Sequence, residues 1–167
     1  MSVDSFQVTR GLSLFNGRTD MIRQQDDLMQ QIDRSVRSGH RFFVDSYFSL
    51  QDPEVRTAFN YIVDVKKQLL VDIARWVTPI HDSLHDTASP ALAAERTYQD
   101  LGRNFRANSL STNAQELGFC EAQLLKLVER VFEVTTDADL KRVLKAYYPQ
   151  LIICREAMWR MSALRVA

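Results

Sequence analysis

The four residues Gln51-Asp52-Pro53-Glu54 decide the fold, because they mark the point where one helix must stop and the next must start. The Asp52 side chain can accept hydrogen bonds from the free N–H groups of the following helix. Pro53 suits the first helical position, where its missing N–H is not needed, and Glu54 complements the positive end of the helix dipole. A turn this short predicts that the two flanking helices are antiparallel neighbours.

The segments on either side of this turn both carry apolar residues at helical spacing. Residues 18–50 contain no proline and one glycine, Gly39, and they predict a helix about 50 Å long. The second helix is predicted to begin at Pro53 and to kink or end near Val77, because Pro79 cannot continue it. The apolar stripes are Ile22, Met29, Val36, Phe43 and Leu50 before the turn and Val55, Phe59, Ile62, Leu69, Ile73, Trp76 and Ile80 after it.

The second half of the chain shows a similar pair of helices around a second tight turn, Thr135-Thr136-Asp137. A cap-like cluster at residues 111–113 predicts a third helix over residues 113–134. The last helix is predicted over residues 138–165, with a bend just before Pro149, which lies inside it.

Between the two pairs, residues 81–92 predict a long connection and residues 91–108 a short helix or two. The predicted fold is therefore all-α: two antiparallel helical hairpins joined by a long crossover containing a short helix, in an up-down-down-up four-helix bundle. Only 5 glycines and 4 prolines in 167 residues argue against a sandwich or a barrel. The length suits one domain, predicted over residues 18–167 after a flexible N-terminal lead-in at residues 1–17.

Three stretches of the sequence carry a family resemblance: Ser38-Gly39-His40-Arg41-Phe42, Asp52-Pro53-Glu54-Val55-Arg56-Thr57-Ala58-Phe59, and a hairpin from Cys120-Glu121 through Asp137 to Ala157 and Leu164. The sequence resembles an uncharacterised bacterial family of ferritin-like four-helix bundles. In that family a glycine-containing first helix similarly runs into an Asp-Pro-Glu turn, with a phenylalanine on the second helix. The resemblance implies a ferritin-like fold for about residues 30–165, although the interval from Gly39 to Pro53 is a few residues longer here.

A ferritin-like di-metal site takes a Glu from each of two helices and a Glu-x-x-His pair from each of the other two, since residues three apart share a helix face. No Glu of this sequence is followed by a His three residues later. The resemblance therefore implies a divergent member that lacks the di-metal ligand set, and no cofactor is predicted. An alternative is a metal-binding or redox protein with non-standard ligands, for which the candidates are His81, Asp82 and His85, at a ligand-like spacing, and Glu121.

Two charged residues lie on or near the apolar stripes of the predicted helices. Lys66 is in the core phase between Ile62 and Leu69, and Glu121 belongs to the third helix. The two side chains are candidates for an ion pair inside the bundle that specifies register, with Asp45 of the first helix as a candidate third member. The alternative is that Lys66 extends its ammonium group to solvent and that Glu121 lies on the surface.

The sequence contains no Gly-rich phosphate loop, no GxSxG and no HExxH, so no enzymatic activity is predicted. Its 21 basic and 21 acidic residues balance, which argues against nucleic-acid binding. The charge is unevenly placed, because six basic residues and one acidic residue follow from Lys141 onward, whereas residues 51–100 hold eight acidic and five basic residues. This asymmetry suits self-association or the docking of an acidic partner, and the alternative is an ordinary bundle surface with salt bridges.

The predicted function is that of a non-catalytic helical bundle acting through protein–protein contacts, as a regulatory, adaptor or stress-related protein that self-associates as a homodimer. Aromatic residues beside arginines on the last helix are typical of interface hot spots. A further alternative is a small-molecule sensor that binds its ligand in the bundle core, where Gly39 and Ser46 leave room. The predicted partner-binding residues are Arg142, Lys145, Tyr148, Arg155, Trp159 and Arg160.

The sequence favours a cytoplasmic location. Its N-terminus shows no basic region followed by an apolar stretch, as a signal peptide would. No run approaches the roughly 18 apolar residues of a membrane span, so no membrane insertion is predicted. Cys120 and Cys154 are far apart and form no CxxC motif, and they are predicted to be buried structural thiols, with a redox pair as the alternative.

Overall fold

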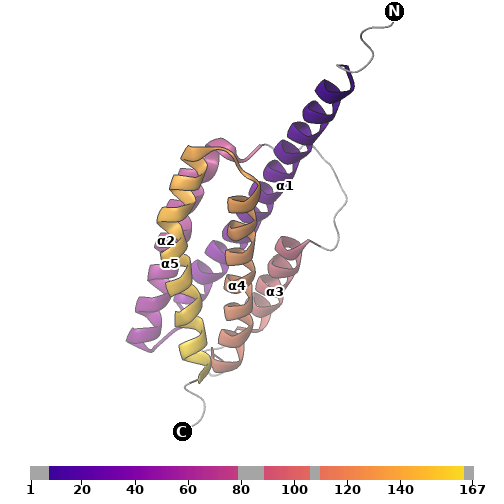
Figure 1. Cartoon of the computed structure of the whole chain (residues 1–167). Coiled ribbons are helices and arrows are strands. Elements are labelled where there is room, and N and C mark those ends of the chain that lie inside the picture. Colours follow the sequence, from indigo (N-terminus) through magenta and orange to yellow (C-terminus); the bar gives the residue numbers. More distant parts are fainter. Residues whose placement is uncertain (1–7, 79–88, 106–109, 164–167) are drawn as a thin grey trace, which may run out of the picture.

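The computed structural model describes residues 8–78, 89–105 and 110–163, and all the regular structure of these residues is helical. The elements are α1 (Val8–Tyr47), α2 (Pro53–Ile73), the short 3₁₀ helix η1 (Ala74–Trp76), α3 (Pro90–Asn104), α4 (Leu110–Val134) and α5 (Ala138–Ala163). Figure 1 shows these helices packed side by side. The predicted all-α class is therefore confirmed.

Helix α1 begins well before the predicted start at Arg18 and takes up much of the predicted lead-in. No proline interrupts residues 8–17, and a glycine inside a helix costs only about 1 kcal/mol. Every residue from Gly17 to Gln24 is exposed, and Figure 1 shows this end of α1 extending beyond the other helices. Residues 1–7 lie outside the described residues.

The turn between α1 and α2 has the structure that its sequence predicts. Asp52 Oδ1 accepts hydrogen bonds from the backbone N–H of Glu54 at 2.8 Å and of Val55 at 3.4 Å, and Pro53 is the first residue of α2. Helices α1 and α2 are consequently antiparallel neighbours (Figure 1). Helix α2 ends at Ile73 and passes into η1, close to the predicted end.

The four long helices surround one core. Helices α4 and α5 form a second antiparallel hairpin, α1 packs against α2 and α4, and α5 packs against α2 and α4. Helix α3 lies against α1 and α4 (Figure 1). In the core, the fully buried rings of Phe43 and Phe59 meet edge to face, with their centroids 4.9 Å apart. Helix α5 continues through Pro149.

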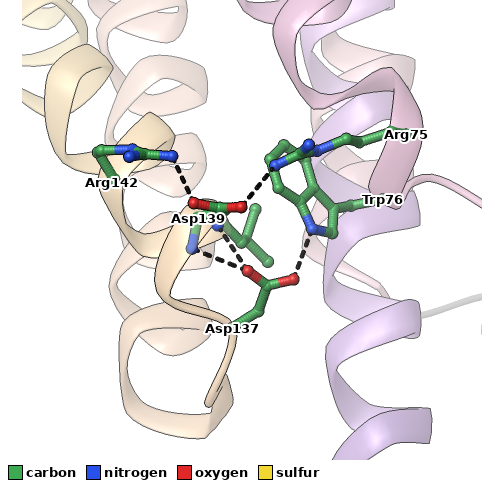
Figure 2. A network of polar contacts seen from close by, with 6 residues as sticks. Arg75, Trp76, Asp137, Asp139 and Arg142 are labelled. Carbon is green, nitrogen blue, oxygen red and sulfur yellow. Dashed lines mark hydrogen bonds and ion pairs between the residues drawn. The ribbon is translucent and has the colours of Figure 1, made fainter.

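The turn between α4 and α5 is hydrogen-bonded to η1, at the end of the first hairpin, as Figure 2 shows. Asp137 Oδ1 accepts hydrogen bonds from the backbone N–H of Asp139 and of Leu140, both at 2.9 Å. Its Oδ2 accepts a third bond from the Trp76 indole N–H at 2.8 Å. The Leu140 and Trp76 donors stabilise the carboxylate, and they hold the pKa of Asp137 below its ordinary value. Arg75 covers the Trp76 ring, 3.9 Å from its centroid, and lies 3.4 Å from Asp139.

We expect Asp137→Ala to destabilise the protein by about 2 kcal/mol, because it removes a helix cap and leaves the Trp76 N–H without its acceptor. Asp52→Ala is the matched control, since it removes a similar cap that has only backbone donors; it is expected to cost about 1 kcal/mol. Urea unfolding followed by circular dichroism measures both losses. Equal losses would show that the Trp76 contact contributes nothing to stability.

Candidate functional site

The middle of the bundle holds a buried ion pair between α2 and α4. Lys66 Nζ lies 2.9 Å from Oε1 and 3.0 Å from Oε2 of Glu121, and both side chains are 0% exposed. Lys66 occupies the apolar phase of α2 together with Ile62 and Leu69, which are also buried. The sequence left open whether Lys66 and Glu121 pair inside the bundle or reach the surface. The structure shows the pair inside the bundle.

The third member of this cluster is Tyr98 of α3 and not Asp45. The Tyr98 hydroxyl donates a hydrogen bond to Glu121 Oε1 at 3.0 Å. Burial, and then the Glu121 charge, raise the pKa of Tyr98 well above its ordinary value. Asp45 is exposed and lines a surface cavity between α1 and α3. The expectation for Asp45 was wrong. Asp45 follows the buried Phe43 by two residues, which is a rotation of about 200° around the helix, so Asp45 lies on the opposite side of α1 from Phe43. Lys66, Tyr98 and Glu121 are called the buried cluster below.

A signal for Tyr98 was present in the sequence. Ala91, Ala94, Tyr98 and Leu101 are all buried, and they recur at the three- and four-residue spacing of a helix face. The spacing predicts that this face is covered. It does not show which helices cover it, so Tyr98 could not be matched to Glu121 from the sequence.

Gly39 of α1 makes room for the buried cluster. A Cβ atom at Gly39 would lie 3.0 Å from Lys66 Cε, 3.0 Å from the Tyr98 hydroxyl oxygen and 3.1 Å from Lys66 Nζ. The space beside Gly39 is therefore filled by protein, which corrects the expectation that a ligand enters there. Ser46, the other small residue of that expectation, lines the cavity between α1 and α3.

The buried cluster neutralises its own charge, and this limits what it can bind. The Lys66 ammonium group contacts both carboxylate oxygens of Glu121, so a metal cation at the same carboxylate would be repelled. Among the residues that the structure describes, no three His, Cys, Asp or Glu side chains form a group that could hold a metal ion. The metal candidates His81, Asp82 and His85 lie outside those residues.

Both cysteines are buried and free, one on α4 and one on α5. Burial, and then the negative charge of Glu121, raise the pKa of Cys120 and of Cys154 to about 12. A thiol that keeps its proton at neutral pH is a poor nucleophile and a poor metal ligand. This environment favours a structural role for both thiols.

The six residues predicted to bind a partner fall into two groups on α5. Arg142, Lys145 and Arg160 are exposed. The others lie toward α4, where the Tyr148 hydroxyl donates a hydrogen bond to Glu129 Oε1 of that helix. Arg155 and Trp159 belong to this second group. Its side chains already make contacts within the chain.

Trp159 is held against α4 and is nevertheless 40% exposed. A Cβ atom at Gly118 would lie 2.2 Å from Trp159 Cδ1 and Nε1, so the ring lies directly on the α4 backbone. The Arg155 guanidinium lies 5.0 Å from the ring centroid and pairs with Glu156 at 2.8 Å. These contacts fix an aromatic ring at the surface of α5, next in sequence to the exposed Arg160.

Helices α2 and α5 pack side by side and expose residues of opposite charge. Glu54 and Asp64 are exposed on α2. Arg160 and Arg142, which pairs with Asp139, are exposed on α5. Glu54 and Arg160 line the same groove, of about 540 Å³, at one end of the two helices. Tyr61 and Val71 of α2 and Ile153 and Trp159 of α5 are also exposed. The α2–α5 surface is defined here by Glu54, Tyr61 and Asp64 of α2 and by Arg142, Ile153 and Arg160 of α5.

No helix within residues 8–78, 89–105 and 110–163 is long and apolar enough to cross a membrane. Comparisons with protein-family models, with curated proteins and with solved structures find no match to this chain.

Proposed function

We propose that this chain is a non-catalytic four-helix bundle of the ferritin-like type that acts through protein–protein contacts, as a self-associating regulatory or adaptor protein. Two antiparallel hairpins, α1–α2 and α4–α5, support the fold, together with the connection between them that carries α3. In an up-down-down-up bundle of this type, α2 and α4 run in the same direction. A bacterial, cytoplasmic setting is supported by the family resemblance and by the two free thiols.

One observation carries the proposal of self-association: Glu54 of α2 and Arg160 of α5 line the same groove between the two helices. A two-fold axis parallel to these helices would bring α2 of one copy against α5 of a second copy, so that opposite charges meet twice. Glu54 of one copy would then face Arg160 of the second. Tyr61 and Ile153, which are 36% and 48% exposed, would be buried between the copies.

The exposed basic residues of α2, Arg56 and Lys67, do not interrupt this arrangement, because they lie toward α1. The Arg56 guanidinium lies 4.8 Å from the centroid of the Tyr47 ring of α1. The charge of Lys67 acts on His40 of α1, whose pKa it helps to lower after burial and the Lys66 charge. Trp159 lies at the α4 edge of the α2–α5 surface, and we propose it as the aromatic anchor of the contact.

A charge exchange tests this surface. Arg160→Glu and Glu54→Arg are each expected to weaken self-association by about tenfold or more, because each turns two attractive contacts into two repulsive ones. An equimolar mixture of the two variants is expected to associate like the wild-type chain, since both contacts of the mixed pair again join opposite charges. Sedimentation velocity measures the association, and circular dichroism checks that each variant is folded.

The control is Arg103→Glu, which changes the net charge equally at a side chain of α3 that is 74% exposed. This variant is expected to associate like the wild-type chain. A wild-type chain that stays monomeric at every concentration would overturn the proposal of self-association. A mixture that associates as weakly as its two components would exclude the α2–α5 surface.

A further inference from the structure

A cavity of about 450 Å³ lies between α1 and α3, on the outer side of the buried cluster. Its volume is within the range of about 300–1,000 Å³ that is usual for small-molecule sites. Polar, charged and aromatic side chains all contribute to its lining. The residues that line it are Ser38, Arg41, Phe42, Asp45, Ser46, Ser49, Glu95, Tyr98, Gln99, Gly102, Arg103 and Phe105.

Two opposite charges of α1 face this cavity without neutralising each other. Asp33 and Arg37, four residues apart, form an ion pair at 2.8 Å. Arg41 and Asp45 have the same spacing in the reverse order, which is the less favourable order for a helix. They form no ion pair with each other or with another residue in the described part of the chain. As far as the described residues go, both groups are available to a ligand.

The other two charges at the cavity are already paired. Glu95 lies 2.7 Å from Arg34, and Arg103 lies 3.5 Å from Asp100. A ligand that enters the cavity thus meets one cationic group and one anionic group, one helical turn apart. This arrangement matches a molecule that carries both a carboxylate and an ammonium group, and a ligand with a single charge would leave one of the two groups unmatched.

An aromatic wall lies beside these charges. The Phe42 ring meets the Phe105 ring edge to face with centroids 5.5 Å apart, and it lies 5.7 Å from the Tyr98 ring. Gly102 leaves this wall open, because a Cβ atom there would meet only Phe42 Cδ2, at 4.0 Å. Rings in this arrangement suit a planar or bulky apolar group.

We propose that the cavity between α1 and α3 binds a free amino acid with an aromatic or bulky apolar side chain, in its zwitterionic form. Arg41 binds the carboxylate through charge-assisted hydrogen bonds, and Asp45 accepts hydrogen bonds from the ammonium group. The side chain of the ligand packs on Phe42 and Phe105. This site shares no residue with the α2–α5 surface, so the proposal of ligand binding does not depend on self-association.

Amide chemical shifts of the full chain provide the test, with L-phenylalanine, N-acetyl-L-phenylalanine and L-phenylalaninamide as probes. L-Phenylalanine is expected to give saturable shifts at residues 41–46 and at Gly102. Asp45→Asn is expected to weaken L-phenylalanine about tenfold, which is the effect of one charge-assisted bond, and to leave the N-acetyl compound unchanged. Arg41→Gln is expected to weaken L-phenylalanine similarly and to leave the amide unchanged.

Two glycine variants form a matched pair. Gly102→Leu places a side chain in the cavity and is expected to abolish binding, whereas Gly17→Leu, at an exposed glycine of α1 with open space around it, is expected to bind normally. The absence of saturable shifts around the cavity with all three probes, up to millimolar concentrations, would overturn the proposal. Binding that neither Asp45→Asn nor Arg41→Gln weakens would also overturn it, and these two surface changes leave the core intact.

Discussion

Glu121→Leu is expected to destabilise the folded protein by about 3–5 kcal/mol, because it leaves the Lys66 ammonium group buried without its counter-charge. Lys66 is 0% exposed and its Nζ lies within 3.0 Å of both oxygens of the Glu121 carboxylate. The same change removes the acceptor of the Tyr98 hydroxyl, which is also buried. Guanidinium unfolding followed by circular dichroism measures the loss.

The triple variant Lys66→Met, Tyr98→Phe, Glu121→Leu is expected to recover most of this loss. Apolar side chains of similar size remove both buried charges together and leave no polar group without a partner. Recovery would show that the buried cluster contributes little net stability, and that it acts mainly by fixing which faces of α2, α3 and α4 meet. A triple variant as unstable as Glu121→Leu would show that the pair itself stabilises the fold.

The surface pair Asp33–Arg37 provides the matched control. It has a similar distance, 2.8 Å, but its arginine side chain is 61% exposed. Arg37→Ala is therefore expected to cost less than about 1 kcal/mol. If Glu121→Leu cost no more than Arg37→Ala, water would reach the Lys66 ammonium group, and the buried cluster would not be buried in solution.

The second large effect is a loss of stability in alkaline solution that comes from the two cysteines. Burial, and then the Glu121 charge, raise the pKa of Cys120 and of Cys154 from the ordinary value of 9.0 to about 12 in the folded chain. Between these values the unfolded chain releases protons that the folded chain keeps. The contribution is fully present below pH 9 and is lost as the pH rises toward 12.

At about pH 10 each thiol is expected to lower the free energy of unfolding by about 1 kcal/mol relative to neutral pH. The double variant Cys120→Ala, Cys154→Ala should lose much less stability between about pH 8 and pH 10 than the wild-type chain. Small cavities left by the two substitutions lower stability equally at every pH. The comparison is therefore between the slopes of the free energy of unfolding against pH, and not between its absolute values. Parallel slopes would contradict the raised pKa of the thiols. Tyr98 and Tyr147, whose ordinary pKa is 10.0, titrate mainly above this window.

The hairpins of this fold could be predicted from local sequence because their turns are locally encoded. Asp52 and Pro53 cap and start α2 by contacts within a few residues, and Asp137 does the same for α5. The phase of Lys66 within α2 also indicated an inward position. A helical stripe therefore sufficed to place one charged residue in the core.

The partners of these residues could not be predicted, because they depend on how the helices are rotated against each other. Asp45 lies near the apolar stripe of α1 in the sequence, whereas the residue that joins the pair of Lys66 and Glu121 is Tyr98 of α3. The contact between Trp76 and Asp137 joins residues 61 positions apart, and no local pattern encodes it. For the same reason, the basic and aromatic residues of α5 could not be divided from sequence into an exposed group and a group facing α4.

The ammonium group of Lys66 is the cation at the centre of this bundle, and nuclear magnetic resonance of the lysine ammonium groups tests this most directly. One slowly exchanging ammonium signal is predicted, correlated with the carboxylate of Glu121 and lost on Glu121→Gln, while the exposed Lys67 exchanges rapidly with water. Rapid exchange of every lysine ammonium group, with none coupled to Glu121, would contradict the buried cluster.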